Sequence, residues 1–167
     1  MMTFPGLTPW ATIFRPSGAK EDAVKSLGFL VLSMGLLQTA AASKDEAIKK
    51  DKDQLQGKWA IISVVSDGKR ADVTKMVGAM IIFKDDKAIG KGVRLTRGNE
   101  APFKLDPTQK PKMIDFIHDD GAVTPGIYEL DGDKLKICNN TPKFPRPKTF
   151  ESKESSGQVL IILRRER

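Results

Sequence analysis

A hairpin signal in the last third of the chain constrains the fold most strongly. In the run Gly126–Cys138, apolar and charged residues alternate on both sides of Asp131-Gly132. Alternation with a period of two indicates half-buried strands, and Asp-Gly favours the positive φ angles of a tight hairpin turn. A hairpin with one solvent-exposed face needs other strands to cover its apolar face. The chain is therefore expected to form an antiparallel sheet.

Strand-like segments follow one another at close spacing from Gly57 to the end of the chain. Many are bounded by turn signals such as Asp67-Gly68 and Asp85-Asp86, and short strands joined by local turns are typical of an up-and-down meander. Closing a meander into a barrel removes its unpaired edges. We therefore predict an all-β, antiparallel up-and-down barrel of about eight strands, with a short N-terminal helix. Besides the hairpin, the expected strands are residues 59–66, 79–84, 87–96, 102–105, 112–118, 148–152 and 158–165.

Residues 1–42 have the layout of an N-terminal extension with a secretory signal peptide. The run Leu27–Leu37 is apolar and uncharged, follows Lys20 and Lys25, and precedes three alanines that end at Ala42. This order is typical of a cleaved signal, whereas a bilayer span needs about 20 apolar residues. We expect cleavage near Ala42 and export to the periplasm or the outside of the cell. An uncleaved anchor and a buried helix are the alternatives.

The remaining chain divides into two parts. Ser43-Lys44-Asp45-Glu46 fits a capping box, so residues 43–56 are expected to form a helix or a linker. Charged residues outnumber apolar ones there, which predicts modest burial against the domain. Residues 57–167 are expected to form the barrel domain.

Charge and composition exclude several classes of protein. The 28 Lys and Arg residues against 21 Asp and Glu give a net charge of +7, but the basic residues are interspersed with acidic ones, and nucleic-acid binding requires clustering. A single cysteine, Cys138, excludes an intrachain disulfide, and with His118 as the only histidine a four-ligand zinc site cannot form. We expect no metal, no cofactor and no nucleic-acid partner.

Catalytic groups are weakly indicated. His118 beside Asp119 and Asp120 could act as a general base, but it stands where a strand meets a turn, which favours an ordinary surface histidine. Asp85-Asp86 lacks the oxygen spacing of a calcium loop and is explained by turn chemistry. Cys138 falls on the polar phase of its strand, where a half-exposed thiol between lysines would have thiolate character. These patterns predict a protein that is not an enzyme.

The chain resembles a known family in several runs of residues. Gly57-Lys58-Trp59 is similar to the Gly-x-Trp signature of lipocalins. Further resemblance lies in Phe103–Pro107, Lys110–Asp115, Gly126–Asp133, Arg146-Pro147, Phe150 and Ser156–Leu160. In order and spacing these runs resemble a paralogous family of small planctomycete domains described as lipocalin-like and uncharacterised.

The resemblance implies a lipocalin-like barrel and an export signal, and it supplies no catalytic residues. It also implies that Gly57 and Trp59 close one end of the barrel against a basic residue of the last strand, either Arg164 or Arg165.

A set of aromatic residues is the remaining candidate for a site. They lie on different expected strands and face inward, where they could line a cavity for a small apolar ligand, with a tyrosine hydroxyl to orient it. The same rings could instead fill a solid core, and periodicity does not separate these interpretations. The candidate lining residues are Phe83, Phe103, Phe116, Tyr128 and Phe150.

Three functions follow from these patterns. The first is an exported, non-catalytic protein that binds a small apolar ligand inside the barrel. The second is a cell-envelope module with a solid core that contacts another protein. A small hydrolase or isomerase is the third, and no arrangement of base and nucleophile supports it.

Overall fold

The computed structural model describes residues 43–93 and 98–167, which belong to one compact unit, Ala40–Arg167. The predicted signal peptide over residues 1–42 lies outside the described residues. A helix at 43–55 precedes the sheet, and a short 3-10 helix, η1 (Val73–Met76), connects β2 to β3. The strands are β1 (Gly57–Ser66), β2 (Lys69–Arg70), β3 (Met80–Lys84), β4 (Lys87–Lys91), β5 (Glu100–Asp106), β6 (Lys112–Ile117), β7 (Val123–Asp131), β8 (Lys134–Asn140) and β9 (Gln158–Arg165).

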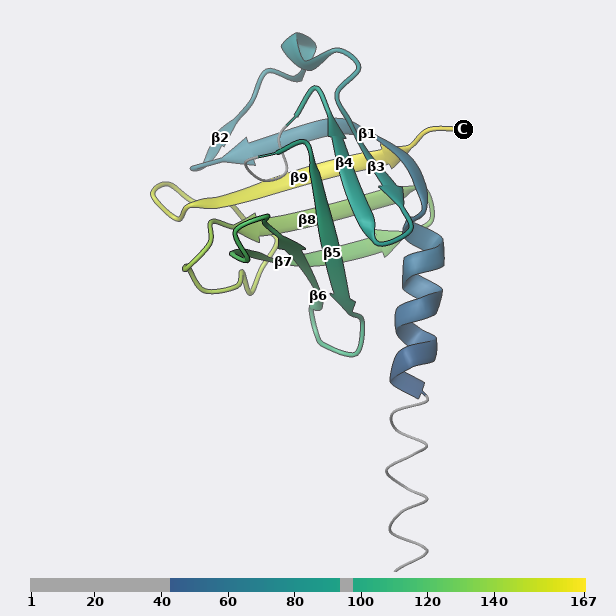
Figure 1. The fold of residues 1–167 in the computed structure, drawn as a ribbon. Coiled ribbons are helices and arrows are strands. Elements are labelled where there is room, and N and C mark those ends of the chain that lie inside the picture. Colours follow the sequence, from purple (N-terminus) through teal and green to yellow (C-terminus); the bar gives the residue numbers. More distant parts are fainter. Residues whose placement is uncertain (1–42, 94–97) are drawn as a thin grey trace, which may run out of the picture. The chain divides into compact units, whose positions relative to one another are not determined.

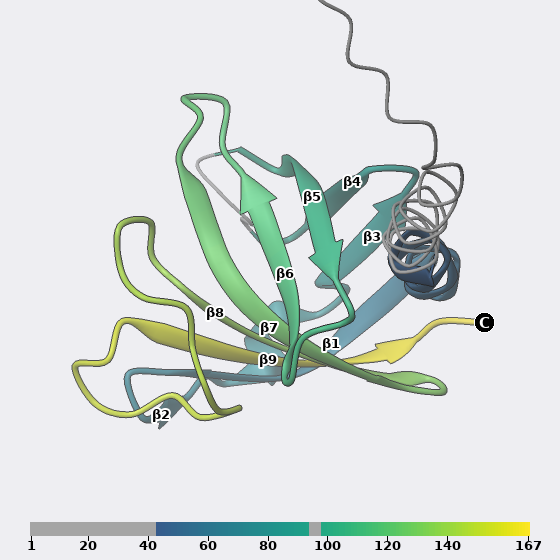
Figure 2. The same ribbon diagram turned by 90° about the horizontal axis from the view of Figure 1, so that it is seen from below.

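The strands close into an antiparallel barrel of eight, as predicted (Figures 1 and 2). The sheet runs in the order β2-β1-β3-β4-β5-β6-β7-β8-β9, and β1 also pairs with β9. Ala60 of β1 pairs with Met80 on one side and with Arg164 on the other, which completes the ring. A register shift between Ile61 and Ser63 bends β1 there, as a bulge does. The two-residue β2 pairs only with the end of β1.

Two tight turns illustrate how the sequence sets the strand register. Asp67 and Gly68 have φ angles of 49° and 73°, so this Asp-Gly pair occupies the centre of a β1–β2 hairpin in the manner of a type I′ turn. In the β7–β8 hairpin the central residues are Gly132 and Asp133, because Asp131 pairs with Lys134.

The β7–β8 turn is thus centred one residue later than the Asp131-Gly132 signal predicts. The observed register sets Leu130 opposite Leu135, and a turn centred on the Asp-Gly pair would separate these two inward residues. Only Gly132 has a positive φ, 55°, and glycine at the first central position is the pattern of a type II′ turn.

Two strand predictions are wrong, one in its existence and the other in its extent. Residues 148–152 form no strand but belong to an irregular connection, residues 141–157, between β8 and β9. Pro145 and Pro147 lie in this connection, and proline cannot donate to a sheet ladder. The strand predicted over 87–96 ends at Lys91, beside Gly92 with a φ of 70°, a conformation that does not continue a strand. The last part of this prediction, residues 94–96, lies outside the described residues.

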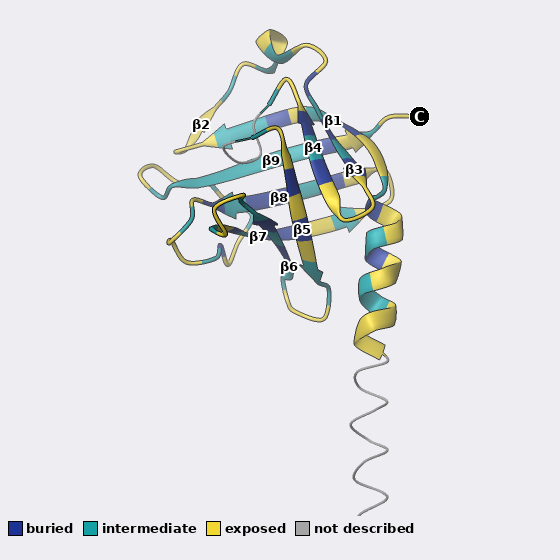
Figure 3. Ribbon diagram, in the orientation of Figure 1, coloured by how far each residue is buried: buried dark blue, intermediate teal, exposed yellow. Residues whose placement is uncertain are grey.

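Buried apolar residues form one core cluster inside the barrel, and Figure 3 marks the buried positions along the strands. Trp59, Phe83, Phe116 and Tyr128 are each no more than 1% exposed. With almost no accessible area, these side chains pack against their neighbours inside the barrel. The rest of the buried core comprises Leu55, Ile81, Ala88, Ala101, Phe103, Ile114, Leu135, Ile137 and Leu163.

The antiparallel order gives the barrel two distinct ends. The helix end holds the start of β1 and the β3–β4, β5–β6 and β7–β8 turns, and the helix of residues 43–55 lies beside it (Figure 1). The far end holds the β2–β3, β4–β5, β6–β7 and β8–β9 connections.

Candidate functional site

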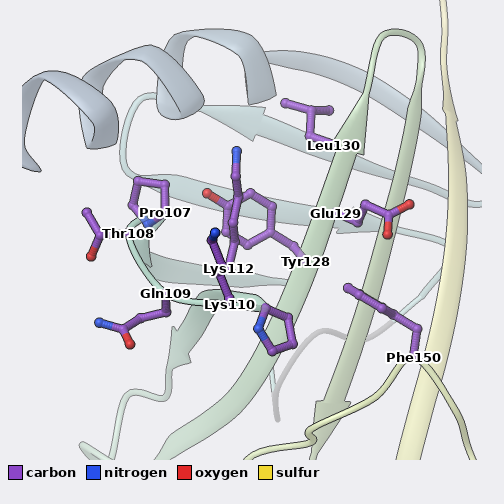
Figure 4. Close-up of a pocket in the computed structure, with 10 residues that line it drawn as sticks. Pro107, Thr108, Gln109, Lys110, Lys112, Tyr128, Glu129, Leu130 and Phe150 are labelled. Atoms are coloured by element: carbon purple, nitrogen blue, oxygen red, sulfur yellow. The ribbon is translucent and has the colours of Figure 1, made fainter.

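A hollow of about 290 Å³ opens at the helix end of the barrel. We call it the helix-end hollow (Figure 4). The β5–β6 loop forms one side and the end of β7 the other, with Tyr128 and two lysines between them. Its walls are mainly apolar, with amide, ammonium and carboxylate groups at the rim. The lining residues are Pro107, Thr108, Gln109, Lys110, Pro111, Lys112, Tyr128, Glu129, Leu130 and Phe150.

Unequal strand lengths leave room for this hollow. The pairing of β6 with β7 ends at Lys112 and Tyr128, but β7 continues to Asp131. Beyond Tyr128 the edge of β7 therefore faces the β5–β6 loop instead of a strand. A sheet edge without a neighbour leaves backbone groups and side chains accessible.

Asp106 fixes the shape of the β5–β6 loop. Its Oδ1 atom accepts hydrogen bonds from the Thr108 backbone N–H at 3.2 Å and the Thr108 hydroxyl at 2.5 Å, which is the local turn that aspartate favours. Its Oδ2 atom accepts from Lys44 of the helix at 3.0 Å. The hydrogen bonds from Thr108 and then Lys44 lower the pKa of Asp106 to about 2. The loop is therefore held by a charged carboxylate at neutral pH.

A buried polar cluster joins the helix to this end of the barrel. Asp51 is 4% exposed, and its Oδ2 atom accepts from the Tyr128 hydroxyl at 2.6 Å and the Lys112 ammonium at 2.6 Å. Lys112 also lies over the Tyr128 ring, 5.8 Å from its centroid. Burial, and then the hydrogen bond to Asp51, raise the pKa of Tyr128 far above its ordinary value. The hydroxyl is therefore a proton donor at neutral pH.

The structure places four of the five candidate lining residues in the core. Phe83 and Phe103 pack edge to face with ring centroids 5.2 Å apart, and Phe116 and Tyr128 join them in the core. Phe150 does not: it lies in the 141–157 connection, is half-buried, and lines the helix-end hollow together with Tyr128. Of the five candidate residues, only Tyr128 and Phe150 border the same hollow.

The barrel-end group predicted from the lipocalin resemblance comes together around Trp59. Its indole N–H donates to the Leu55 carbonyl at 2.7 Å, and the Arg165 guanidinium lies 4.2 Å from the ring centroid. At Gly57, which has a φ of 111°, a Cβ atom would lie 3.4 Å from Arg165 Nη1. Of the two arginines, Arg165 is the one at the indole, and Arg164 is exposed.

Replacing Arg165 with alanine is expected to lower the free energy of unfolding by about 2 kcal/mol, because a cation–π contact and hydrogen bonds from a charged donor are lost. The guanidinium donates to the carbonyls of Gln56, at 2.7 Å, and of Gln54. The matched control is Arg164→Ala, which should change stability by less than about 0.5 kcal/mol. Urea unfolding followed by circular dichroism measures both. Equal losses in the two variants would contradict this assignment.

His118 and Asp120 take part in local hydrogen bonds. His118 Nε2 lies 2.7 Å from the Thr124 hydroxyl, and Asp120 accepts from the Ala122 backbone N–H at 3.0 Å within the β6–β7 turn. In the Asp85-Asp86 turn, Asp86 forms an ion pair with Lys52.

Cys138 is not half-exposed, contrary to the expectation. It faces outward, but the 141–157 connection covers it completely, and its thiol donates to the Glu151 carbonyl at 3.3 Å. Burial raises the pKa of Cys138 to about 11, so the thiol has little thiolate character at neutral pH.

A second hollow of about 430 Å³ lies along the β3–β4 turn. Two ion pairs lie along it, Lys87 with Glu100 at 2.5 Å and Lys52 with Asp86, and Ile89 is its one apolar wall residue. A ligand would gain little apolar contact there, so the helix-end hollow is the stronger candidate.

Metal sites and membrane spans can be described for residues 43–93 and 98–167. Within them, His, Cys, Asp and Glu side chains form no group of three or more suited to a metal ion. In the same part of the chain, no helix has the length and apolar character needed to cross a bilayer.

Comparisons with protein-family models, with curated proteins and with solved structures find no match to this chain. The resemblance to the planctomycete family stays a prediction.

The sequence interpretation missed Asp51, Lys112 and the β5–β6 loop. One signal was present: Ile48, Asp51 and Leu55 recur at helical spacing, so an aspartate occupies the middle of the stripe that faces the domain. A carboxylate in such a stripe needs buried donors. Its donors lie 61 and 77 residues away along the chain, which no local pattern reveals.

Proposed function

We propose that this protein is an exported, non-catalytic binding domain of lipocalin-like type, and that it binds a small, largely apolar ligand in the helix-end hollow. The observation that carries the proposal is the hollow itself, about 290 Å³ in volume and walled by Leu130, Phe150 and two prolines. Ligand sites are commonly apolar with a few polar groups, and this volume is at the lower end of their range.

The filled interior favours this location over the centre of the barrel. Phe83, Phe116 and Trp59 have no more than 1% of their surface exposed, so a ligand between them would have to displace core side chains, which is costly. The hollow requires no such change. Phe150 and Tyr128, two of the aromatic residues predicted to line a site, border it.

Benzyl alcohol is a suitable probe, because it carries one ring and one neutral polar group. We expect it to shift backbone NMR resonances of residues 107–112, 128–130 and 150. Phe150→Ala should weaken its binding about tenfold, since removing a contacting ring costs about 1.5 kcal/mol. Phe144→Ala is the matched control, because Phe144 lies in the same connection and is 58% exposed. Equal binding by both variants, or shifts confined to the barrel interior, would overturn the location.

A second function, an envelope module that contacts another protein, is favoured by exposed apolar residues toward the far end. Val77 is 90% exposed and Phe144 58% exposed, and both lie in connections at that end. Exposed apolar groups mark interaction surfaces when they are contiguous. Crosslinking in native envelopes with a photoreactive residue at position 77 tests this alternative against one at position 104, an exposed strand position.

A further inference from the structure

Lys112 and Tyr128 form a pair of donors carried by the barrel alone. They stand directly opposite each other in β6 and β7, and the ammonium and the hydroxyl meet at one oxygen atom, Asp51 Oδ2, each at 2.6 Å. Hydrogen bonds from such donors to a carboxylate are short and strong. The barrel therefore presents a carboxylate-binding arrangement, and only the carboxylate comes from outside it.

The helix that supplies this carboxylate is anchored at its C-terminal end, where the Trp59 indole and Arg165 donate to the carbonyls of Leu55 and Gln54. In the described helix only Asp51 and Leu55 are buried. Its other links to the barrel include ion pairs at the surface, Lys44 with Asp106 at 3.0 Å and Lys52 with Asp86. Exposed ion pairs contribute little to stability. A competing carboxylate would therefore have to replace mainly the two hydrogen bonds that Asp51 accepts.

The charges around the hollow favour an anion. Glu129 is paired with Lys136 at 2.7 Å, and Asp106 with Lys44. Lys110 also lines the hollow, and no described carboxylate pairs with it. An unpaired ammonium beside neutralised carboxylates leaves a local positive charge.

We propose that Lys112 and Tyr128 are the binding site for the carboxylate of a small organic acid, and that Asp51 occupies this site as an intramolecular substitute. The acid displaces Asp51 while its apolar part fills the helix-end hollow (Figure 4). This inference rests on the proposed function and adds the chemical class of the ligand.

The test compares benzoate with benzyl alcohol, which differ in the carboxylate, on the full chain. In Asp51→Ala, benzoate should bind about tenfold tighter or more than in wild type, because an internal competitor lowers apparent affinity by the fraction of sites it fills. Benzyl alcohol should bind both proteins equally. Asp53→Ala is the matched control, since Asp53 lies on the same helix, is exposed, and pairs only with Lys49 among the described residues. In this control, benzoate binding should equal that of wild type.

A second readout separates a carboxylate site from a merely structural ion pair. Saturating benzoate should speed hydrogen exchange of amides in residues 47–55 of the wild-type protein, and benzyl alcohol should not. Lys112→Met, which removes the ammonium but keeps an unbranched side chain, should abolish the preference for benzoate over benzyl alcohol. If Asp51→Ala does not fold, Asp51→Asn replaces it, because the amide keeps the shape and removes the charge.

The outcomes distinguish the two proposals. Tighter benzoate binding in the Asp51 variant, with Asp53→Ala unchanged, supports the inference. If benzoate and benzyl alcohol bind wild type and Asp51 variant alike, the inference is overturned and the proposed function stands. If neither compound binds either protein, the proposed function is overturned together with the inference.

Discussion

Replacing Trp59 with alanine is expected to lower the free energy of unfolding by about 4 kcal/mol, the usual cost of truncating a large buried aromatic residue. Trp59 is completely buried, and three interactions meet at its ring. The indole N–H donates to the Leu55 carbonyl, the Arg165 guanidinium covers one face, and the core packs around it. A small domain has a total stability of roughly 5–15 kcal/mol, so the variant loses a large share of it.

Two further variants identify the cause of this loss. Trp59→Phe keeps most of the apolar ring but removes the hydrogen bond, and it should cost about 1–2 kcal/mol. Phe144→Ala removes an exposed aromatic side chain and should cost less than about 0.5 kcal/mol. Guanidinium unfolding followed by circular dichroism gives the three values. A loss below about 1 kcal/mol in Trp59→Ala would mean that the barrel end is not closed by this residue.

The sequence predicted the barrel because two periodic signals agree with the final packing. Alternation in β7 and β8 places Tyr128 and Leu135 inward, and strands of this kind have few other ways to bury one face. The exact turn was less predictable, since Gly132-Asp133 and Asp131-Gly132 are both acceptable locally. The inward pairing of Leu130 with Leu135 decides between them, and that pairing is a property of the whole sheet.

The candidate site was less predictable because its parts come from four separate segments. Asp51 lies in the helix, Lys112 and Tyr128 in neighbouring strands, and Phe150 in an irregular connection. Phe150 falls in the segment predicted as a strand, residues 148–152, but it lies in the irregular 141–157 connection, where the Arg146 side chain donates to the carbonyls of Gly126 and Ile114. Such long-range contacts depend on closure of the barrel, and a local pattern cannot supply them.

Arg146 is the residue on which the course of the 141–157 connection most depends. Its Nη1 atom donates to the carbonyls of Gly126 at 2.6 Å and Ile114 at 3.2 Å, and its Nη2 atom pairs with Asp115 at 2.7 Å. Hydrogen bonds from a charged donor contribute about 1.5–3 kcal/mol each. The connection that Arg146 anchors covers Cys138, so the reactivity of this thiol reports whether the connection is closed.

Replacing Arg146 with alanine is therefore expected to raise the rate at which Cys138 reacts with Ellman's reagent by about a hundredfold. A loss of about 3 kcal/mol in closing free energy increases the open population by that factor. In the closed state, burial raises the pKa of Cys138 to about 11, against about 8.5 for a free thiol. The same shift makes the folded state lose stability as pH rises from about 8.5 to 11, because the unfolded chain releases its thiol proton first.

The planar guanidinium of Arg146, rather than its charge alone, should account for the low reactivity of Cys138. Arg146→Lys keeps a positive charge but not the planar set of donors, so its thiol reactivity should approach that of Arg146→Ala. Lys148→Ala removes an exposed charge from the same connection and should leave the rate unchanged. If Arg146→Ala reacts no faster than Lys148→Ala, the connection is held by other contacts, such as the bond from Asn140 Nδ2 to the Pro145 carbonyl at 3.0 Å. The burial of Cys138 would then not depend on the contacts that Arg146 makes between the 141–157 connection and the barrel.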